Sequence, residues 1–322
     1  MMKDLTDMQS GSIILAGSIA IDRIMNFDGT FEEAIKPDKL HVLSLSVLLS
    51  NVTDSPGGVA ANIAYNLAML GEMSMLVGAV GSNGKEYMDE LKMVGVDTSN
   101  VHFSDLPTAT FTVLTDKNDC QVGGFYPGAM ADENQVSLTS VITDKKQLVV
   151  ISAHDPELMA RQVEECRENK YRLFYDISQQ VSNVSSGQIK AGLEVAELLI
   201  VNDYEMQVIQ DKTALSFEQI QKLVPLIIVT LGGEGSLVFD QRTGKSIEVK
   251  VPAVPNVKVI DPTGAGDAFR AGFLYGYVRE WDVETCVQWG SVTASFAIEK
   301  HGTQTHTFNT TKIKKLVEKY YK

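Results

Sequence analysis

The sequence contains few cysteines, and they are widely spaced. Cys120, Cys166 and Cys286 are odd in number and show neither a disulfide framework nor the paired spacing of a zinc site. This pattern is typical of a protein in a reducing compartment. We therefore expect a cytoplasmic protein.

Long apolar runs are also missing from the sequence. Residues 1–10 are mostly polar, and the apolar run at residues 13–16 is too short for the core of a signal peptide or for a membrane span. We therefore expect no membrane partner.

A surplus of positive charge is missing as well. The chain has 28 Lys and Arg against 41 Asp and Glu, which gives a formal net charge of −13. A duplex nucleic acid needs a basic face, so we expect no nucleic-acid partner. The charge does not exclude a nucleotide, because ATP arrives with Mg²⁺ and can be held by backbone amides.

Apolar runs and helical patterns alternate regularly from residue 148 onward. Short Val, Ile and Leu runs separated by helices indicate a parallel sheet that is covered on both faces. The sequence therefore predicts an α/β fold, with a doubly wound, mostly parallel sheet flanked by helices, in a single domain over residues 1–322. Strands are expected at residues 12–16, 74–80, 148–152, 173–176, 198–202, 226–230 and 236–239, and helices at 59–70, 84–94, 156–169, 187–195, from 204, and at 268–279, 283–299 and 310–321.

Two segments do not fit this alternation and are assigned to a small β lid, roughly residues 20–50 and 105–128. In the second segment, strands at 110–115 and 120–125 flank a turn sequence, which predicts a hairpin. In the first, we expect one or two strands between residues 27 and 50. A further β-rich run is expected over residues 246–260.

Residues 261–269 read Asp-Pro-Thr-Gly-Ala-Gly-Asp-Ala-Phe and form the strongest motif in the chain. Glycines at the start of a predicted helix let backbone amides approach a phosphate, and the helix dipole favours negative charge there. The amides of Gly264, Ala265, Gly266 and Asp267 would surround a phosphoryl group during its transfer. Asp267 would accept the proton of an attacking hydroxyl group. The motif is not a Walker P-loop, because no Gly-Lys-Ser/Thr follows.

Three weaker motifs also place polar groups at turns. Residues 56–62 join paired glycines to a helix that carries Asn62 one turn in, and a ligand site or a simple capped turn explains them equally well. Residues 202–205 and 230–235 follow predicted strands at the sheet edge where ligands of α/β proteins bind. Taken alone, each is better explained as a helix cap or a tight turn. Arg270 would either approach the phosphate or lie on the helix surface.

Together these motifs resemble the ribokinase-like (PfkB) family of carbohydrate and nucleoside kinases. Residues 56–62 are similar to its first signature and residues 261–267 to its second, and residues 202–205 and 230–235 resemble its metal, phosphate and nucleotide elements. The order and spacing fit from about residue 12 to residue 318. Within the family, the resemblance is to bacterial-type adenosine kinases, through residues 17–22, 125–130, 178–180, 202–205 and 261–270.

The resemblance implies an acceptor pocket for a nucleoside. Asp22 would grip two ribose hydroxyl groups, which suits a bidentate carboxylate. Phe111 and Phe125 face each other across the predicted hairpin and would sandwich the adenine, although both rings would also suit the core of the hairpin. The implied substrate-binding residues are Ser18, Asp22, Gly57, Gly58, Asn62, Phe111, Phe125, Gln179 and Gln180.

The resemblance also implies the phosphoryl donor and its cofactors. ATP would be the donor, and Asn202 and Glu205 would hold Mg²⁺ through water. A K⁺ site near Asp261 and a homodimer formed through the lid are further implications. The implied ATP-binding residues are Asn202, Thr230, Gly232, Gly235, Gly264 and Gly266.

These implications predict an ATP-dependent kinase that phosphorylates the 5′-hydroxyl of adenosine, with AMP and ADP as products, as in purine salvage. A broad-specificity nucleoside kinase or a sugar kinase of the same family is the alternative within enzymes. A non-catalytic nucleoside sensor is the alternative of another class, and the intact Asp267 argues against it. A Rossmann dehydrogenase would need Gly-x-Gly-x-x-Gly after the first strand, where residues 17–22 read Gly-Ser-Ile-Ala-Ile-Asp instead.

Overall fold

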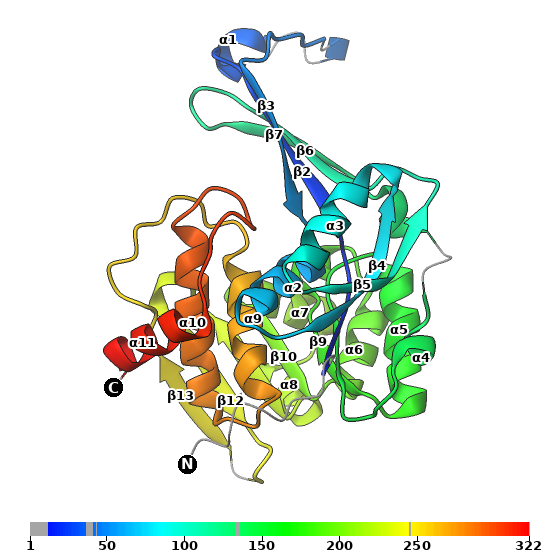
Figure 1. Cartoon of the computed structure of the whole chain (residues 1–322), viewed down its shortest axis with the longest axis vertical. Helices are drawn as coiled ribbons and strands as arrows, with labels where there is room; N and C mark the ends of the chain where they lie inside the picture. Colours follow the sequence, from blue (N-terminus) through cyan, green and yellow to red (C-terminus); the bar gives the residue numbers. More distant parts are fainter. Residues whose placement is uncertain (1–11, 37–40, 43, 133–135, 245, 322) are drawn as a thin grey trace.

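The structure is a computed structural model that describes residues 12–36, 41–42, 44–132, 136–244 and 246–321. The polar N-terminal stretch and positions 37–40 and 43 of the expected lid therefore lie outside the described residues. Over the described residues, the strands form one nine-stranded sheet and one four-stranded sheet (Figure 1). They are called the large sheet and the small sheet below.

The large sheet has the order β13-β12-β11-β10-β9-β8-β1-β4-β5. Its strands run parallel from β5 to β11, whereas β12 and β13 are antiparallel additions at one edge. The inner parallel strands are short, apolar and largely buried on both faces, as a covered parallel sheet requires, whereas the edge strand β5 is largely polar and partly exposed. The strands are β1 (Ile13–Ala16), β4 (Ser74–Gly81), β5 (Asp97–Ser104), β8 (Leu148–Ile151), β9 (Arg172–Tyr175), β10 (Leu198–Asn202), β11 (Leu226–Thr230), β12 (Ser236–Asp240) and β13 (Ile247–Val251).

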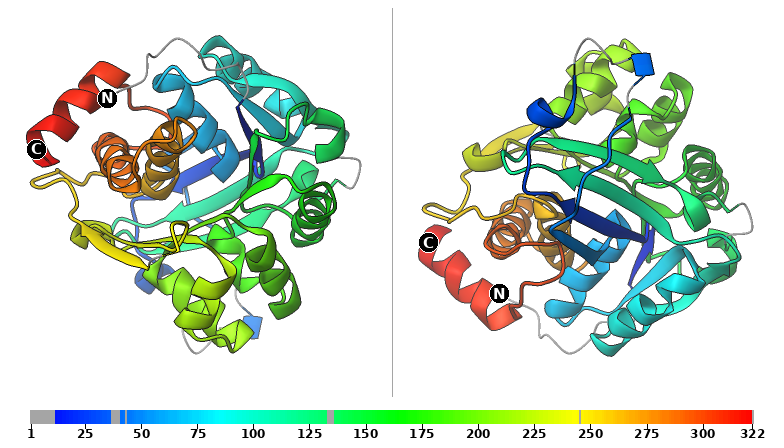
Figure 2. Two further views of the ribbon diagram at one scale, coloured as in Figure 1. Left: turned by 90° about the horizontal axis from the view of Figure 1, so that it is seen from below. Right: turned by 90° about the horizontal axis from the view of Figure 1, so that it is seen from above.

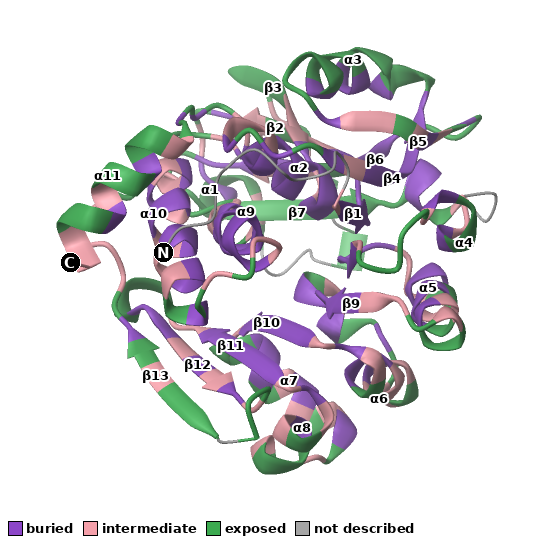
Figure 3. Ribbon diagram, turned by 60° about the horizontal axis from the view of Figure 1, so that its bottom comes forward, coloured by how far each residue is buried: buried purple, intermediate pink, exposed green. Residues whose placement is uncertain are grey.

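Helices cover both faces of the large sheet (Figures 2 and 3). Alternate residues of the central strands enter the two cores. Ile13 and Leu15 pack with one set of helices, and Ile14 and Ala16 pack with the other. The first set is α2 (Val59–Met69), α3 (Lys85–Met93), α9 (Ala265–Tyr277), α10 (Val283–Ile298) and α11 (Thr310–Tyr321), and the second is α4 (Leu138–Val141), α5 (Pro156–Asn169), α6 (Ser186–Val195), α7 (Asp203–Thr213) and α8 (Phe217–Leu223).

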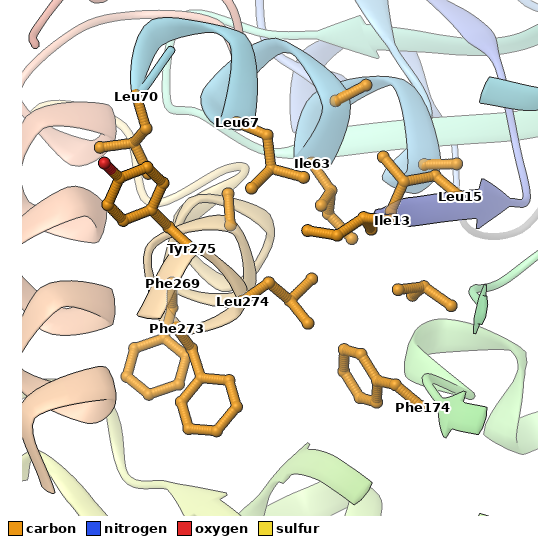
Figure 4. Packing of buried hydrophobic residues seen from close by; sticks show 14 of the residues in the cluster. Ile13, Leu15, Ile63, Leu67, Leu70, Phe174, Phe269, Phe273, Leu274 and Tyr275 are labelled. Carbon is orange, nitrogen blue, oxygen red and sulfur yellow. The ribbon is translucent and has the colours of Figure 1, made fainter. Parts of the chain in front are cut away.

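Helices α2 and α9 lie together at the centre of the first core. Leu67 and Ile63 of α2 point toward Leu274 of α9, above the side chains of β1 (Figure 4). Both helices are buried around most of their circumference because they are sandwiched between the sheet and other helices. This packing fixes the N-termini of α2 and α9 beside each other, which is where the site is built.

The small sheet has the order β3-β2-β6-β7 and projects beyond the body of the molecule together with α1 (Phe31–Ala34) (Figure 1). Residues 17–19 are the only link from β1 to β2, and β3 leads directly into α2. The strands of the small sheet are β2 (Ala20–Asn26), β3 (Asn51–Gly57), β6 (Ala109–Thr115) and β7 (Gln121–Tyr126).

The structure confirms the predicted doubly wound α/β fold and the hairpin of β6 and β7, and it corrects two details. The strand expected within residues 27–50 is instead β3, which begins at Asn51, and the described part of that segment contains the short α1 and no strand. Strand β3 reads Asn-Val-Thr-Asp-Ser-Pro-Gly, a polar sequence with proline that only an exposed edge strand tolerates. The run expected over 246–260 ends at Val251, because Pro252 and Pro255 interrupt the strand.

Among the described residues, no helix combines the length and the apolar character that crossing a membrane would require.

Candidate active site

A cavity of about 620 Å³ lies where the small sheet meets the N-termini of α2 and α9 and the carboxyl ends of β10 and β11. Most of the residues predicted from the sequence lie on its wall: Ser18, Asp22, Gly58, Asn62, Phe111, Phe125, Gln179, Gln180, Asn202, Glu205, Thr230, Gly232, Gly264, Gly266 and Asp267. The wall also includes residues that the sequence reasoning did not select as site residues: Ala20, Val59, Met130, Ala153, Ser178, Asn183, Thr263, Arg270 and Thr303.

Gly57, Ala265 and Gly235 are not part of the cavity wall. Gly235 has a φ of 95° and closes the turn between β11 and β12, where its carbonyl accepts from the amide of Leu231 at 2.7 Å. A Cβ at Gly235 would meet the carbonyl of Val251 at 2.1 Å. The glycine is therefore explained by the turn itself, and its expected place beside ATP finds no support in the cavity.

The N-terminus of α9 presents free backbone amides to the cavity. Gly264 caps the helix with a φ of 78°, a conformation that favours glycine. The amides of Gly264, Gly266 and Asp267 have no partner among the described residues, whereas the amide of Ala265 donates to Pro262 O at 3.2 Å. The anion turn is thus formed by three free amides, without the fourth that the sequence suggested.

Asp267 lies on the first turn of α9 and is held by Asn62 of α2. The side-chain amide of Asn62 donates to Asp267 Oδ2 at 2.8 Å. Burial raises the pKa of Asp267 to about 6, with a smaller upward contribution from Glu205, while Arg270 and the Asn62 hydrogen bond oppose the rise. At neutral pH this carboxylate is ionised and has more affinity for a proton than an exposed aspartate, which suits a general base.

Arg270 is buried beneath the anion turn and does not lie on the helix surface. Its side chain is 7% exposed, and its Nη2 lies 2.8 Å from Oδ1 of Asp176, which is fully buried after β9. The same Nη2 donates to the carbonyl of Ile200 at 3.2 Å. Burial raises the pKa of Asp176, and Arg270 opposes that rise. The guanidinium group also interacts electrostatically with Glu205 and Asp267, two carboxylates of the cavity wall.

Asp22 projects from β2 into the cavity, and the paired glycines make room for it. A Cβ at Gly57 would lie 2.5 Å from Asp22 Oδ2, and one at Gly58, where φ is 94°, would lie 2.6 Å from Ser18 O. The Ser18 hydroxyl accepts from the amide of Val59 at 2.9 Å and so holds the start of α2. Burial, Asp267 and Asp261 raise the pKa of Asp22 to about 6. Gly57 therefore leaves space for the Asp22 carboxylate, although Gly57 itself does not line the cavity.

Phe111 and Phe125 are directly paired across β6 and β7. Directly paired residues of antiparallel strands project from the same face, so the two rings form one aromatic wall and do not oppose each other across a ligand. A Cβ at Gly123 would lie 3.1 Å from the Phe111 ring, which shows that this ring extends over the glycine. The rings are 39% and 48% exposed and are therefore not a closed hairpin core.

Asn202 and Glu205 form a reciprocal cap at the start of α7. Asn202 Oδ1 accepts from the Glu205 amide at 2.7 Å, and Glu205 Oε2 accepts from the Asn202 amide at 2.9 Å. Both side chains also line the cavity beside Thr230 of β11. Among the described residues, no group of three acidic, histidine or cysteine side chains is arranged to hold a metal. Asn202 and Glu205 are oxygen donors on the cavity wall, and such donors suit Mg²⁺ when phosphate oxygens and water complete its shell.

Two of the residues missed as site residues differ in how far the sequence could have revealed them. Arg270 is a lone cation within the apolar run of residues 268–274 and on the same helical face as Asp267, a pattern that indicates a buried charge. Thr303 lies in the loop between α10 and α11, far from the motifs in sequence. Only the packing of α10 against α9 brings that loop to the cavity.

The fold and the site are those of an α/β phosphotransferase, with free helix-terminal amides and a buried carboxylate at the carboxyl edge of a parallel sheet. The pattern of the pfkB family of carbohydrate kinases matches residues 18–310, and the chain belongs to this family.

Three known proteins illustrate the similarity. The nucleoside kinase of Methanothermobacter thermautotrophicus is 31% identical over 280 residues, which cover 86% of this chain and 89% of that protein. The nucleoside kinase of Methanocaldococcus jannaschii superposes with a TM-score of 0.84 at 28% identity, covering 95% and 98% of the two chains. The ligand-free nucleoside kinase of Burkholderia thailandensis superposes with a TM-score of 0.80 at 31% identity, covering 95% and 99%. The Burkholderia enzyme is also known in complexes with inosine and with ADP and inosine.

Proposed function

We propose that this protein is a nucleoside kinase that transfers the γ-phosphoryl group of ATP to the 5′-hydroxyl of adenosine. The observation that carries the proposal is that one cavity joins the anion turn and Asp267 to Asp22 and the aromatic wall of Phe111 and Phe125. The anion turn and Asp267 would serve phosphoryl transfer. Asp22 provides a carboxylate for vicinal hydroxyl groups, and the aromatic wall beside it provides a surface for a nucleobase. The similarity to the nucleoside kinases named above supports the nucleoside kinase part of this proposal.

The acceptor half of the cavity accounts for a ribose and a base. An ionised Asp22 offers two oxygens to two ribose hydroxyl groups. Asn62 lines the same cavity and donates to Asp267. The nucleobase would stack against the rings of Phe111 and Phe125. These rings can cover the face of a nucleobase, but they form no hydrogen bonds to its polar edge. Ser18, Gln179 and Gln180 complete this half.

The donor half accounts for ATP. Its phosphates would lie along Thr230 and Gly232 toward the free amides of Gly264 and Gly266, where a helix N-terminus favours negative charge. Asn202 and Glu205 would hold Mg²⁺ through water. When bound, Mg²⁺ neutralises charge that develops on the phosphate oxygens.

In the proposed reaction, Asp267 accepts the proton of the 5′-hydroxyl as that oxygen attacks the γ-phosphorus. The bond between the γ-phosphorus and the bridging oxygen breaks, and ADP leaves with its electron pair. The amides of Gly264, Gly266 and Asp267 stabilise the negative charge on the phosphoryl group. Closure of the small sheet over the sugar would exclude water and so prevent hydrolysis of ATP.

A broader acceptor range is the second candidate, and one observation favours it. The aromatic wall contacts a base through its ring faces, which every nucleobase shares, and both rings remain well exposed. The Burkholderia relative, moreover, is known with inosine.

We further propose a homodimer through the small sheet, because an unpaired sheet edge favours association. We also propose a K⁺ site beside Asp261.

The test is a panel of acceptors with ATP, scored by ADP release and product identification. Adenosine, inosine, cytidine, ribose and fructose separate the candidates. Selective turnover of adenosine supports the proposal, comparable turnover of several nucleosides supports the broader range, and turnover of the free sugars alone contradicts both. Absence of ADP release with every acceptor, together with nucleoside binding, would favour a sensor.

The acidity of Asp22 predicts how nucleoside binding depends on pH. Because the bound hydroxyl groups donate to the ionised carboxylate, affinity should rise with pH through about 6 and level off above it. Calorimetric titration of adenosine between pH 5 and pH 8 measures this. Asp22→Asn should bind weakly with no such dependence. Asp267→Asn removes a charge that raises the pKa of Asp22, so its rise should move to lower pH; an unchanged midpoint in that variant contradicts the coupling.

A further inference from the structure

A chain of hydrogen bonds leads from Asp267 into the loop between α10 and α11. Asn62 Nδ2 donates to Asp267, and Asn62 Oδ1 accepts from Nε2 of Gln304 at 2.9 Å. The same Nε2 donates to the hydroxyl of Tyr87 at 2.5 Å. That hydroxyl donates in turn to the carbonyl of Gly57 at 3.0 Å. Asn62 thus connects Gln304 to Asp267, the proposed general base. The mechanism above assigns no role to Gln304.

The direction of these hydrogen bonds fixes the orientation of the Asn62 amide. If Asn62 were turned over, its oxygen would face the carboxylate of Asp267 and its NH₂ group would face the NH₂ group of Gln304. Both contacts would be repulsive, and the buried groups would lose their partners. If Gln304 were turned over as well, an oxygen would still face ionised Asp267. Only the observed orientation keeps all four of these hydrogen bonds while Asp267 is ionised.

The backbone around Gln304 is held on both sides, so its side chain has a defined position. Thr303 Oγ1 donates to the carbonyl of Pro56 at 2.9 Å. His306 is buried, with Nε2 at 2.7 Å from Asn66 Oδ1, and its carbonyl accepts from Tyr65 at 2.7 Å. These contacts attach the loop to β3 and α2, the elements that carry Gly57 and Asn62.

We propose that Gln304 is a positioning residue for the base: by holding the Asn62 amide in one orientation, it directs Asn62 Nδ2 to the carboxylate of Asp267. The proposal rests on the proposed function, because it gives Asp267 the role of base. The Asn62 hydrogen bond stabilises the ionised form of Asp267, as Arg270 does, while Glu205 opposes it. Asp22, Asp176 and Tyr87 also lie within electrostatic range of Asp267.

The test compares Gln304→Met with a control in the same loop, Thr305→Val. Thr305 donates to the carbonyl of His301 at 2.6 Å and does not touch Asn62. Gln304→Met should lower kcat about 10- to 100-fold, since a small misplacement of a catalytic group has effects of this size, with the KM for ATP within about twofold. Thr305→Val should keep wild-type turnover. Equal turnover in Gln304→Met and wild type overturns the proposal.

A second comparison separates positioning from a general structural role. In the Asp267→Asn background, Gln304→Met should change the residual turnover by less than about twofold, because Gln304 acts through Asp267. An equal loss in both backgrounds overturns the proposal.

A readout that needs no catalysis separates this inference from the proposed function. The carboxyl carbon of Asp267, identified by its loss in Asp267→Asn, can be titrated by NMR in the unliganded protein. Gln304→Met should make Asp267 titrate at higher pH than in wild type, and Thr305→Val should not. If wild type phosphorylates no acceptor while this shift is seen, the function fails and the positioning role stands. An unchanged titration in Gln304→Met overturns the positioning role.

Discussion

Replacing Asp267 by asparagine is expected to lower turnover about 10²- to 10⁴-fold, the usual effect of losing a general base. The substitution keeps the size of the side chain and its contact with Asn62. The free amides of Gly264 and Gly266 remain, so ATP should still bind, and Asp22 should still hold the nucleoside. Single-turnover measurements of product formation, with calorimetric binding of adenosine and ATP, test this expectation directly.

The thermal stability of Asp267→Asn provides the control for this variant. The pKa of Asp267 is raised to about 6 in the folded protein, so folding takes up a proton between about pH 4 and pH 6 and the ionised carboxylate costs stability above that range. Asp267→Asn removes that cost and should unfold at a temperature no lower than wild type at pH 8. Near-normal turnover in a variant that is folded and binds both substrates would remove Asp267 from the role of base.

Replacing Arg270 by methionine is expected to destabilise the protein by about 3–5 kcal/mol, as the loss of one partner of a buried ion pair usually does. Asp176 is fully buried and has Arg270 as its ion-pair partner at 2.8 Å. Without the guanidinium group, Asp176 would keep a buried charge or take up a proton. Glu205 and Asp267 would also lose a nearby cation. Urea unfolding measures the change.

A double variant distinguishes the lost ion pair from lost packing. Arg270→Met with Asp176→Leu removes both charges and fills similar space, so it should recover most of the stability, because apolar replacement of a buried pair is often neutral. The pH dependence has a definite sign. A carboxyl whose pKa rises on folding loses stability as pH increases from its unfolded value, near 4, to its folded value. Arg270→Met should therefore be less stable at pH 8 than at pH 5. A loss below about 1 kcal/mol at pH 8 contradicts the role of Arg270.

Most of the large sheet could be predicted because its signals are local, but its edge strand β5, whose sequence is largely polar, was not predicted. The runs that became β8, β10 and β11 are short, apolar and bounded by helices, and their bounds agree with expectation to within a residue. Strand β3 could not be predicted, because its polar sequence forms a strand only by pairing with β2 along its whole length. The strand is thus a product of tertiary structure.

The residues of the candidate site also fall into two groups, those that a local sequence pattern could predict and those that it could not. Glycine turns and first-turn carboxylates have sequence patterns, so Gly58, Gly264 and Asp267 could be selected in advance. The contacts that tune the base come from segments far apart in the chain. Asn62 and Gln304 are 242 positions apart, and no local pattern marks Gln304. Such residues become visible only when the packing of α2, α9 and α10 is known.

The short connections of the small sheet have a consequence for how acceptor choice changes during evolution. Asp22, Phe111 and Phe125 come from the small sheet, whereas Asn202, Thr230 and Asp267 come from the body. Under the proposed function, substitutions in the small sheet would change the acceptor side of the cavity, while the residues proposed for ATP binding and proton transfer stay in the body. A different acceptor would then need a new surface on the small sheet, with the helix-terminal amides and Asp267 of the body retained.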